Sequence, residues 1–373
     1  MPSTLNPLIA GLAGALADRD YAAFRQRMAE LGARARECEP DDLTAALGEL
    51  APMLGRSHGM FAKVAVLAAA CVEWGGSPLP LRDALPDRAA WAMELYSLFP
   101  AAWAQAADGQ PLPDRADPPP MARIVDTLVA DAARRGNPET YAIPLALTWF
   151  DIEDWVEPMV TVMARRDFRA AMAHRDRIRE AAAALAPGLD SARWLHGLSV
   201  VLDDEPLVVL DHASGRGFRL TMSGIGDNFQ LHTLLADRLI APGLLDGDPP
   251  EPAWVAAATD GPVRLQEASP IVRRFRLFDG HGHDVSPDGR PAGIEPLDGT
   301  RVLVLHPPLA PYGWTSGRAY QRMPPSLTLD HPLDPAEAAT WRSRIAPPLQ
   351  ASLNGKASGP SSDQDSSRGC SGA

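Results

Sequence analysis

Lysine is almost absent from this sequence. Only Lys63 and Lys356 occur in 373 residues, so arginine supplies nearly all of the positive charge. The formal net charge is −12, which argues against nucleic-acid binding because that function needs a basic surface. We interpret the arginine- and alanine-rich composition as the bias of a GC-rich genome and not as a functional pattern.

Cysteine is also scarce. Cys38, Cys71 and Cys370 lie far apart in the chain. Without C-x-x-C spacing they indicate no metal or redox motif, and they are too few for a disulfide-stabilised fold. Cys71 lies within an apolar helical pattern, so we expect it in the core.

Long apolar runs are missing as well. No stretch reaches the ~18 apolar residues that a membrane-spanning helix needs. Residues 8–17 resemble the apolar part of a signal peptide, but no Lys or Arg precedes them and they continue into an amphipathic pattern. We therefore expect a cytoplasmic protein without a membrane partner.

What the sequence does contain is a change of hydrophobic period near residue 190. Helical spacing dominates residues 1–190, which favours a helical bundle or an irregular series of helical hairpins. Residues 191–345 contain short apolar strands, and residues 346–373 have the Ser-, Gly-, Asp- and Pro-rich composition of a disordered tail. We predict an α+β fold: a helical N-terminal region packed on a small mixed or antiparallel sheet with one or two helices.

Strands are predicted where short apolar or alternating runs lie between turn residues. A helix is expected from Asp334, because Asp caps a helix, proline fits its first position, and a glutamate follows three residues after the cap. The expected strands are residues 199–202, 207–210, 218–222, 254–258, 271–278, 301–305 and 326–329.

The best-defined local pattern is strand, turn, strand, glycine loop and helix over residues 205–240. Gly224 and Gly226 form the loop, and Asp227 or Ser223 can cap the helix that follows. Such a loop can hold an anion, which makes Gly224, Gly226 and Asp227 candidate binding residues. The spacing is G-x-G-x-x-F, however, and the alternative is a tight turn that packs the helix on a hairpin.

Three residues are candidates for catalysis. Asn228 and His232 are four positions apart and therefore share one helix face. His306 ends a buried strand, a common position for active-site residues, although the two prolines after it also make it a strand terminator. A buried, hydrogen-bonded packing role is the alternative for His232.

Two groups of polar residues invite a metal-binding interpretation. His281-Gly282-His283-Asp284 offers imidazoles and a carboxylate, but its flanking residues favour an exposed hairpin loop. The acidic residues between positions 151 and 157 fall on one side of a helix, which is typical of a solvated face. We therefore predict no metal site and no cofactor.

A loop that interleaves aromatic and cationic residues is a candidate protein- or peptide-binding surface. Tyr312, Trp314 and Arg318 lie in it, followed by Tyr320 and Arg322. Such residues recognise peptides or planar ligands by stacking and hydrogen bonding. Covering the edge of the sheet is the alternative role for this loop.

The segment 223–236, SGIGDNFQLHTLLA, and the strand 297–305, LDGTRVLVL, carry a resemblance. They resemble a family of uncharacterised actinobacterial proteins over roughly residues 200–310, and the resemblance implies no function. Our first hypothesis is a non-catalytic protein that binds a protein or peptide partner. The alternative is a small-molecule enzyme with a site near Asn228, His232 and His306.

Overall fold

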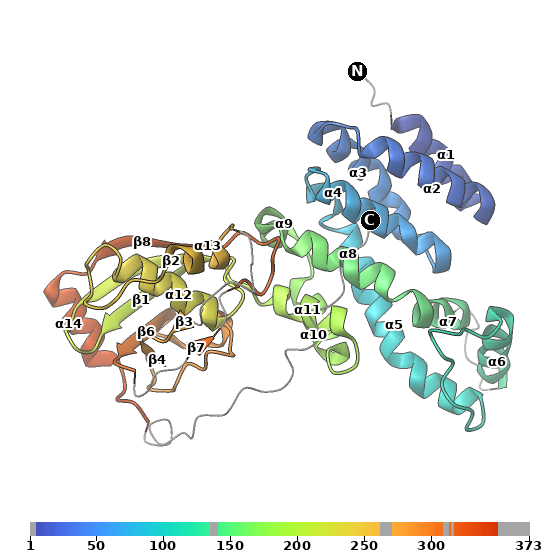
Figure 1. The fold of residues 1–373 in the computed structure, drawn as a ribbon. Coiled ribbons are helices and arrows are strands. Elements are labelled where there is room, and N and C mark those ends of the chain that lie inside the picture. The colour runs from blue at the N-terminus through green and yellow to red at the C-terminus, as the bar shows by residue number, and fades with distance from the viewer. Residues whose placement is uncertain (1–4, 135–140, 262–270, 309–312, 315–316, 350–373) are drawn as a thin grey trace. The chain divides into compact units, whose positions relative to one another are not determined.

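The computed structural model of this chain describes residues 5–134, 141–261, 271–308, 313–314 and 317–349. The chain divides into two compact units, Met1–Val201 and Leu202–Ala373 (Figure 1). The first is helical and the second contains the described strands, as an α+β fold requires. In the described ranges, no helix is both long enough and apolar enough to cross a membrane.

The first unit has eleven α-helices in its described residues, which confirms the helical pattern read from the sequence. Cys71 is buried as expected. The helices are α1 (Asn6–Ala17), α2 (Tyr21–Ala35), α3 (Pro40–Leu54), α4 (Lys63–Glu73), α5 (Ala84–Ala106), α6 (Met121–Arg134), α7 (Ala142–Asp151), α8 (Glu153–Met163), α9 (Arg166–Ala171), α10 (Arg175–Leu185) and α11 (Asp190–Ser199), with the 3₁₀ helices η1 (Gly59–Ala62) and η2 (Leu79–Leu81).

One acidic residue of this unit is not on the solvated face that the sequence predicts. Asp151, at the end of α7, is only 7% exposed, and its Oδ2 accepts the backbone N–H of Gly59 at 2.8 Å. Arg88 on α5 is also buried and lies over the rings of Trp91 and Trp155. Asp151 and Arg88 are thus two buried charged residues inside the helical unit. Burial raises the pKa of the Asp151 carboxyl, and the charge of Arg88 acts to lower it.

The second unit is built around a mixed six-stranded sheet. Its strands run in the order β4-β6-β1-β2-β8, and β5 pairs with β6 in addition. A separate two-stranded sheet pairs β3 with β7. The strands are β1 (Glu205–Asp211), β2 (Gly217–Ser223), β3 (Ile271–Val272), β4 (Arg276–Asp279), β5 (Pro296–Leu297), β6 (Thr300–His306), β7 (Gly313–Trp314) and β8 (Ser326–Pro332).

Helices cover both faces of this sheet. The helices are α12 (Asn228–Leu239), α13 (Pro252–Ala258) and α14 (Pro335–Arg344). Alternate residues of β1 point to opposite faces. Leu207 and Val209 pack in the core that contains α12, whereas Val208 and Leu210 pack with Trp341 of α14. The central strands are therefore continuous apolar runs, because both of their faces are buried.

Two strand predictions were wrong. Residues 199–202 are the end of α11 and a turn, where Arg175 donates to the carbonyl oxygen of Ser199 at 2.9 Å. Residues 254–258 belong to α13, which has Pro252 at its start and is rich in alanine, a strong helix former.

The predicted strand 271–278 is interrupted, and its two ends lie in different sheets as β3 and β4. The backbone N–H groups of Arg274 and Phe275 donate to the side chain of His232 instead of to a neighbouring strand. Residues 346–349, which the sequence assigns to the tail, also have backbone partners: Ala346 and Leu349 donate to the carbonyl oxygens of Gly280 and Gly282.

Candidate functional site

The three candidate catalytic residues do not lie on the same face of the sheet. Asn228 and His232 are on α12, which packs on the face that includes Leu305. His306 is the next residue along β6 and therefore points to the opposite face. There its ring stacks on that of His212 at 4.1 Å, and burial lowers the pKa of His306. The structure therefore brings Asn228 and His232 onto one helix but does not bring His306 to them.

His232 and Asn228 both bind backbone groups. His232 is 4% exposed, and its Nε2 accepts the N–H groups of Arg274 and Phe275, each at 3.1 Å. Burial, followed by the charges of Arg273 and Arg274, lowers the pKa of His232 to about 3. Asn228 donates from Nδ2 to the carbonyl oxygen of Ser286 at 2.8 Å. These contacts hold the segment between β3 and β4, and the loop after β4, against α12.

The glycine loop is packed against neighbouring chain. A Cβ on Gly224, whose φ is +65°, would lie 2.7 Å from the carbonyl oxygen of Pro324, and one on Gly226 would lie 2.8 Å from the Cβ of Ala319. Asp227 caps α12 by accepting the N–H of Gln230 at 2.7 Å, and burial raises its pKa to about 6. The groups that could face an anion therefore have protein partners.

The aromatic–arginine loop is described only in part, and Tyr312 lies outside the described residues. Trp314 forms β7 and packs edge-on against His232, with ring centroids 4.8 Å apart. Arg318 donates to the carbonyl oxygens of Thr259 and Gly261, just after α13. Trp314 and Arg318 therefore both make contacts within the sheet unit.

An open groove lies between the end of α12 and the strand β8. Its volume is about 570 Å³. The strand β8 ends the six-stranded sheet, and within the described ranges no strand pairs with its outer edge. The residues lining the groove are Asp237, Arg238, Ala241, Pro242, Leu327, Thr328 and Leu329.

The strand pairing shows which backbone groups of β8 face this groove. Successive residues of an antiparallel strand point their backbone groups to opposite sides. Asp211 donates its N–H to the carbonyl oxygen of Arg216, so Arg216 and every second residue after it face β1, and the residues between them, including Thr221, face β8. Thr221 is paired with Thr328, and the backbone groups of Thr328 therefore face β2. Leu327 and Leu329 therefore face away from it. Independently, Arg238 donates from Nε to the carbonyl oxygen of Leu327 at 2.9 Å, on the groove side.

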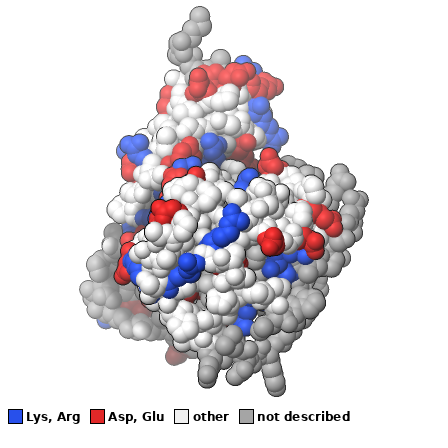
Figure 2. Space-filling model, turned by 90° about the vertical axis from the view of Figure 1, so that its left-hand side faces the viewer, with Lys and Arg blue, Asp and Glu red and all other residues white. Residues whose placement is uncertain are grey.

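Charge does not dominate the face of the molecule in Figure 2. Arginine and acidic side chains lie there in small groups of both signs, separated by neutral residues. In the groove itself, Arg238 lies 3.7 Å from the carboxylate of its neighbour Asp237. Recognition in the groove would therefore depend on shape and backbone hydrogen bonds more than on a field of one sign.

No protein-family model, no curated protein and no solved structure matches this chain. The groove therefore has to be interpreted from its own geometry. The sequence predicts a strand at residues 326–329 but does not show that this strand ends the sheet. The alternation of polar and apolar residues along β8 was the only sequence feature that bears on its position in the sheet. An inner strand with one solvent-exposed face shows the same alternation.

Proposed function

We propose that this protein binds an extended peptide segment, which adds as a further strand to the outer edge of β8. The observation that carries the proposal is the groove at this edge, into which the backbone groups of Leu327 and Leu329 point. Strand addition gives affinity through main-chain hydrogen bonds and specificity through pockets for alternate side chains. We further propose that this binding takes place in the cytoplasm.

The lining of the groove favours a peptide with apolar and basic residues. Leu329, Ala241 and Pro242 offer apolar contacts. The C-terminal end of α12 carries partial negative charge, and Asp237 adds a carboxylate there. Arg238 covers the Leu327 carbonyl, so the ligand strand would start at Leu329 or displace the arginine side chain.

Hydrogen exchange offers the most direct test of strand addition. In the free protein, the amides of Leu327 and Leu329 should exchange fast and that of Thr328 slowly, because only Thr328 faces β2. The full chain is used to select a peptide of about ten residues from a displayed library. Binding of this peptide should slow exchange of the Leu329 amide, and also of the Leu327 amide where the peptide displaces Arg238, and should leave Thr328 unchanged. Peptides that bind without this alternation would contradict the proposal. So would protection that rises with protein concentration alone, which would indicate pairing between copies of the chain.

A proline substitution provides the matching variant. Leu329→Pro removes an N–H that faces the groove, and proline is tolerated on an edge strand at such a position. We expect binding of the selected peptide to weaken at least about tenfold, because a main-chain hydrogen bond and the strand geometry are lost. Leu329→Val keeps the N–H and is the control, expected within about threefold of the wild type. Equal affinities for the two variants would argue against strand addition.

A further inference from the structure

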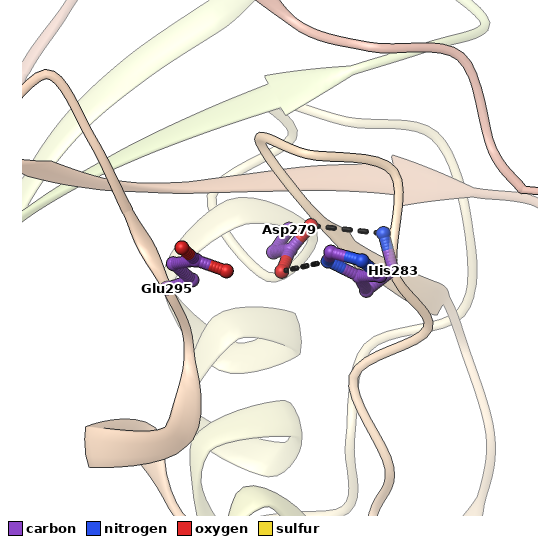
Figure 3. Close-up of side chains that lie close together, drawn as sticks. All are labelled: Asp279, His283 and Glu295. Atoms are coloured by element: carbon purple, nitrogen blue, oxygen red, sulfur yellow. Dashed lines mark hydrogen bonds and ion pairs between the residues drawn. The ribbon is translucent and has the colours of Figure 1, made fainter.

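Three potential metal ligands lie together at the end of β4. Asp279, His283 and Glu295 each offer one ligand atom, and these atoms lie within 4.8 Å of one another (Figure 3). Asp279 is buried, whereas His283 and Glu295 are exposed. The cluster therefore has a fixed carboxylate at its base and two ligands on the solvent side.

Strand pairing explains why these residues meet. Both β4 and β5 pair with the same edge of β6, Asp279 opposite Leu303 and Pro296 opposite Arg301. The residue before β5, Glu295, is thereby brought to the end of β4. The two segments approach closely here, because a Cβ on Gly280 would lie 3.0 Å from the Cβ of Leu297.

The loop after β4 orients the carboxylate. Asp279 Oδ1 accepts the backbone N–H groups of His281 and His283, each at 2.9 Å. Its Oδ2 is left to face the imidazole, 3.1 Å from His283 Nδ1. Both exposed side chains are thus close to an oxygen atom whose position is already set by the backbone, which lowers the entropic cost of assembling a site.

We propose that Asp279, His283 and Glu295 bind a divalent first-row transition-metal ion such as Zn²⁺. Ligand atoms lie about 2.0–2.2 Å from such an ion, so two of them lie about 3–4 Å apart. The 3.1 Å between Asp279 Oδ2 and His283 Nδ1 falls in this range, and all three ligand atoms lie within 4.8 Å of one another. The ion takes the place of the hydrogen bond between Asp279 Oδ2 and His283 Nδ1, with the ring proton on Nε2. One imidazole with two carboxylates favours a transition metal over Ca²⁺ or Mg²⁺, which prefer oxygen ligands alone.

The geometry assigns the histidines of the H-x-H string different roles. His281 Nε2 lies 3.2 Å from the carbonyl oxygen of Pro296, and the His281 and His283 rings are 6.3 Å apart. Only His283 belongs to the three-residue group. The sequence string suggests two histidine ligands, whereas the fold supplies one histidine together with Glu295, a residue outside the string. His281 is therefore the natural control.

Titration with Co²⁺ tests the site, because the ion substitutes for Zn²⁺ and absorbs visible light. Untagged full-length protein, treated with chelator and dialysed, should bind about one equivalent with a saturable absorption change and a matching calorimetric isotherm. Glu295→Gln and His283→Gln should bind at least about tenfold more weakly, whereas His281→Asn should stay within about twofold. Glu295 is exposed, so its variant tests binding without disturbing the core.

Three results would overturn this assignment. The first is the absence of saturable Co²⁺ uptake by the wild type. The second is unchanged uptake by Glu295→Gln, which would place the ion elsewhere. The third is an equal loss of Co²⁺ affinity in His281→Asn and His283→Gln. This result would indicate that both histidines bind the ion and that the separate roles assigned to them are wrong.

Discussion

Replacing Arg88 with methionine should lower the free energy of unfolding of the helical unit by about 3–5 kcal/mol at about pH 8. Arg88 is 5% exposed, and it donates to the carbonyl oxygen of Ser57 at 2.9 Å and contacts His58 Nδ1 at 2.7 Å. Its guanidinium lies 4.0 Å from the ring centroid of Trp91 and 4.6 Å from that of Trp155. Methionine fills similar space but supplies neither the charge nor the donors.

The loss should depend on pH through Asp151. Burial raises the pKa of this carboxyl to about 7, and the charge of Arg88 opposes that rise. Without Arg88 the carboxyl will hold its proton to higher pH, so Arg88→Met should cost less at about pH 6 than at about pH 8, where ionisation leaves an unpaired buried charge. Urea unfolding followed by far-ultraviolet circular dichroism measures both values.

An exposed arginine of the same unit provides the control. Arg177 forms ion pairs with Glu94 at 2.6 Å and Asp87 at 2.7 Å, but all three side chains are at least a third exposed. Exposed pairs contribute little because water and salt screen them, so Arg177→Met should cost under about 1 kcal/mol. If the two variants lose the same free energy of unfolding, burial is not the reason that the contacts of Arg88 stabilise the helical unit.

A feature of the fold could be predicted when the residues that determine it are close together in the sequence. The cap at Asp334 was predictable, and the side chain accepts the N–H of Glu337 at 2.8 Å. Helical period and continuous apolar strands were equally local and gave the α+β class. The break between β3 and β4 was not local, because it depends on His232, which lies about forty positions earlier in the chain.

Functional geometry was harder to predict for the same reason. The sequence does not show that His306 and His232 lie on opposite faces of the sheet. This follows from the packing of α12 on the face that includes Leu305 and from the alternation of side chains along β6, in which His306 comes next. Glu295 had no local signal at all, because its approach to Asp279 depends on two strands sharing one edge of β6. The edge position of β8 likewise follows from the order of strands, which short-range patterns do not contain.

Replacing His232 with leucine should destabilise the sheet unit at neutral pH and remove part of its sensitivity to acid. The substitution leaves the buried N–H of Phe275 and the part-buried N–H of Arg274 without their acceptor, at about 1–3 kcal/mol for an unpaired buried group and less for a part-buried one. We therefore expect a loss of about 2–4 kcal/mol in the free energy of unfolding at about pH 7.5.

The difference between wild type and variant should shrink as the pH falls. The pKa of His232 is about 3 in the folded protein and has an ordinary value of 6.5. Between these values the unfolded chain binds a proton that the folded protein does not, so the wild type loses up to about 1.4 kcal/mol per pH unit on acidification. Leucine cannot titrate, so the free energies of unfolding of His232→Leu and the wild type should converge towards about pH 4.5.

A second variant, His232→Gln, keeps a hydrogen-bond acceptor but has no titrating group. It should lose less stability than His232→Leu at neutral pH and should be more stable than the wild type in acid. A constant difference across this pH range, measured by urea unfolding, would show that burial of the neutral imidazole does not control the acid stability of this unit.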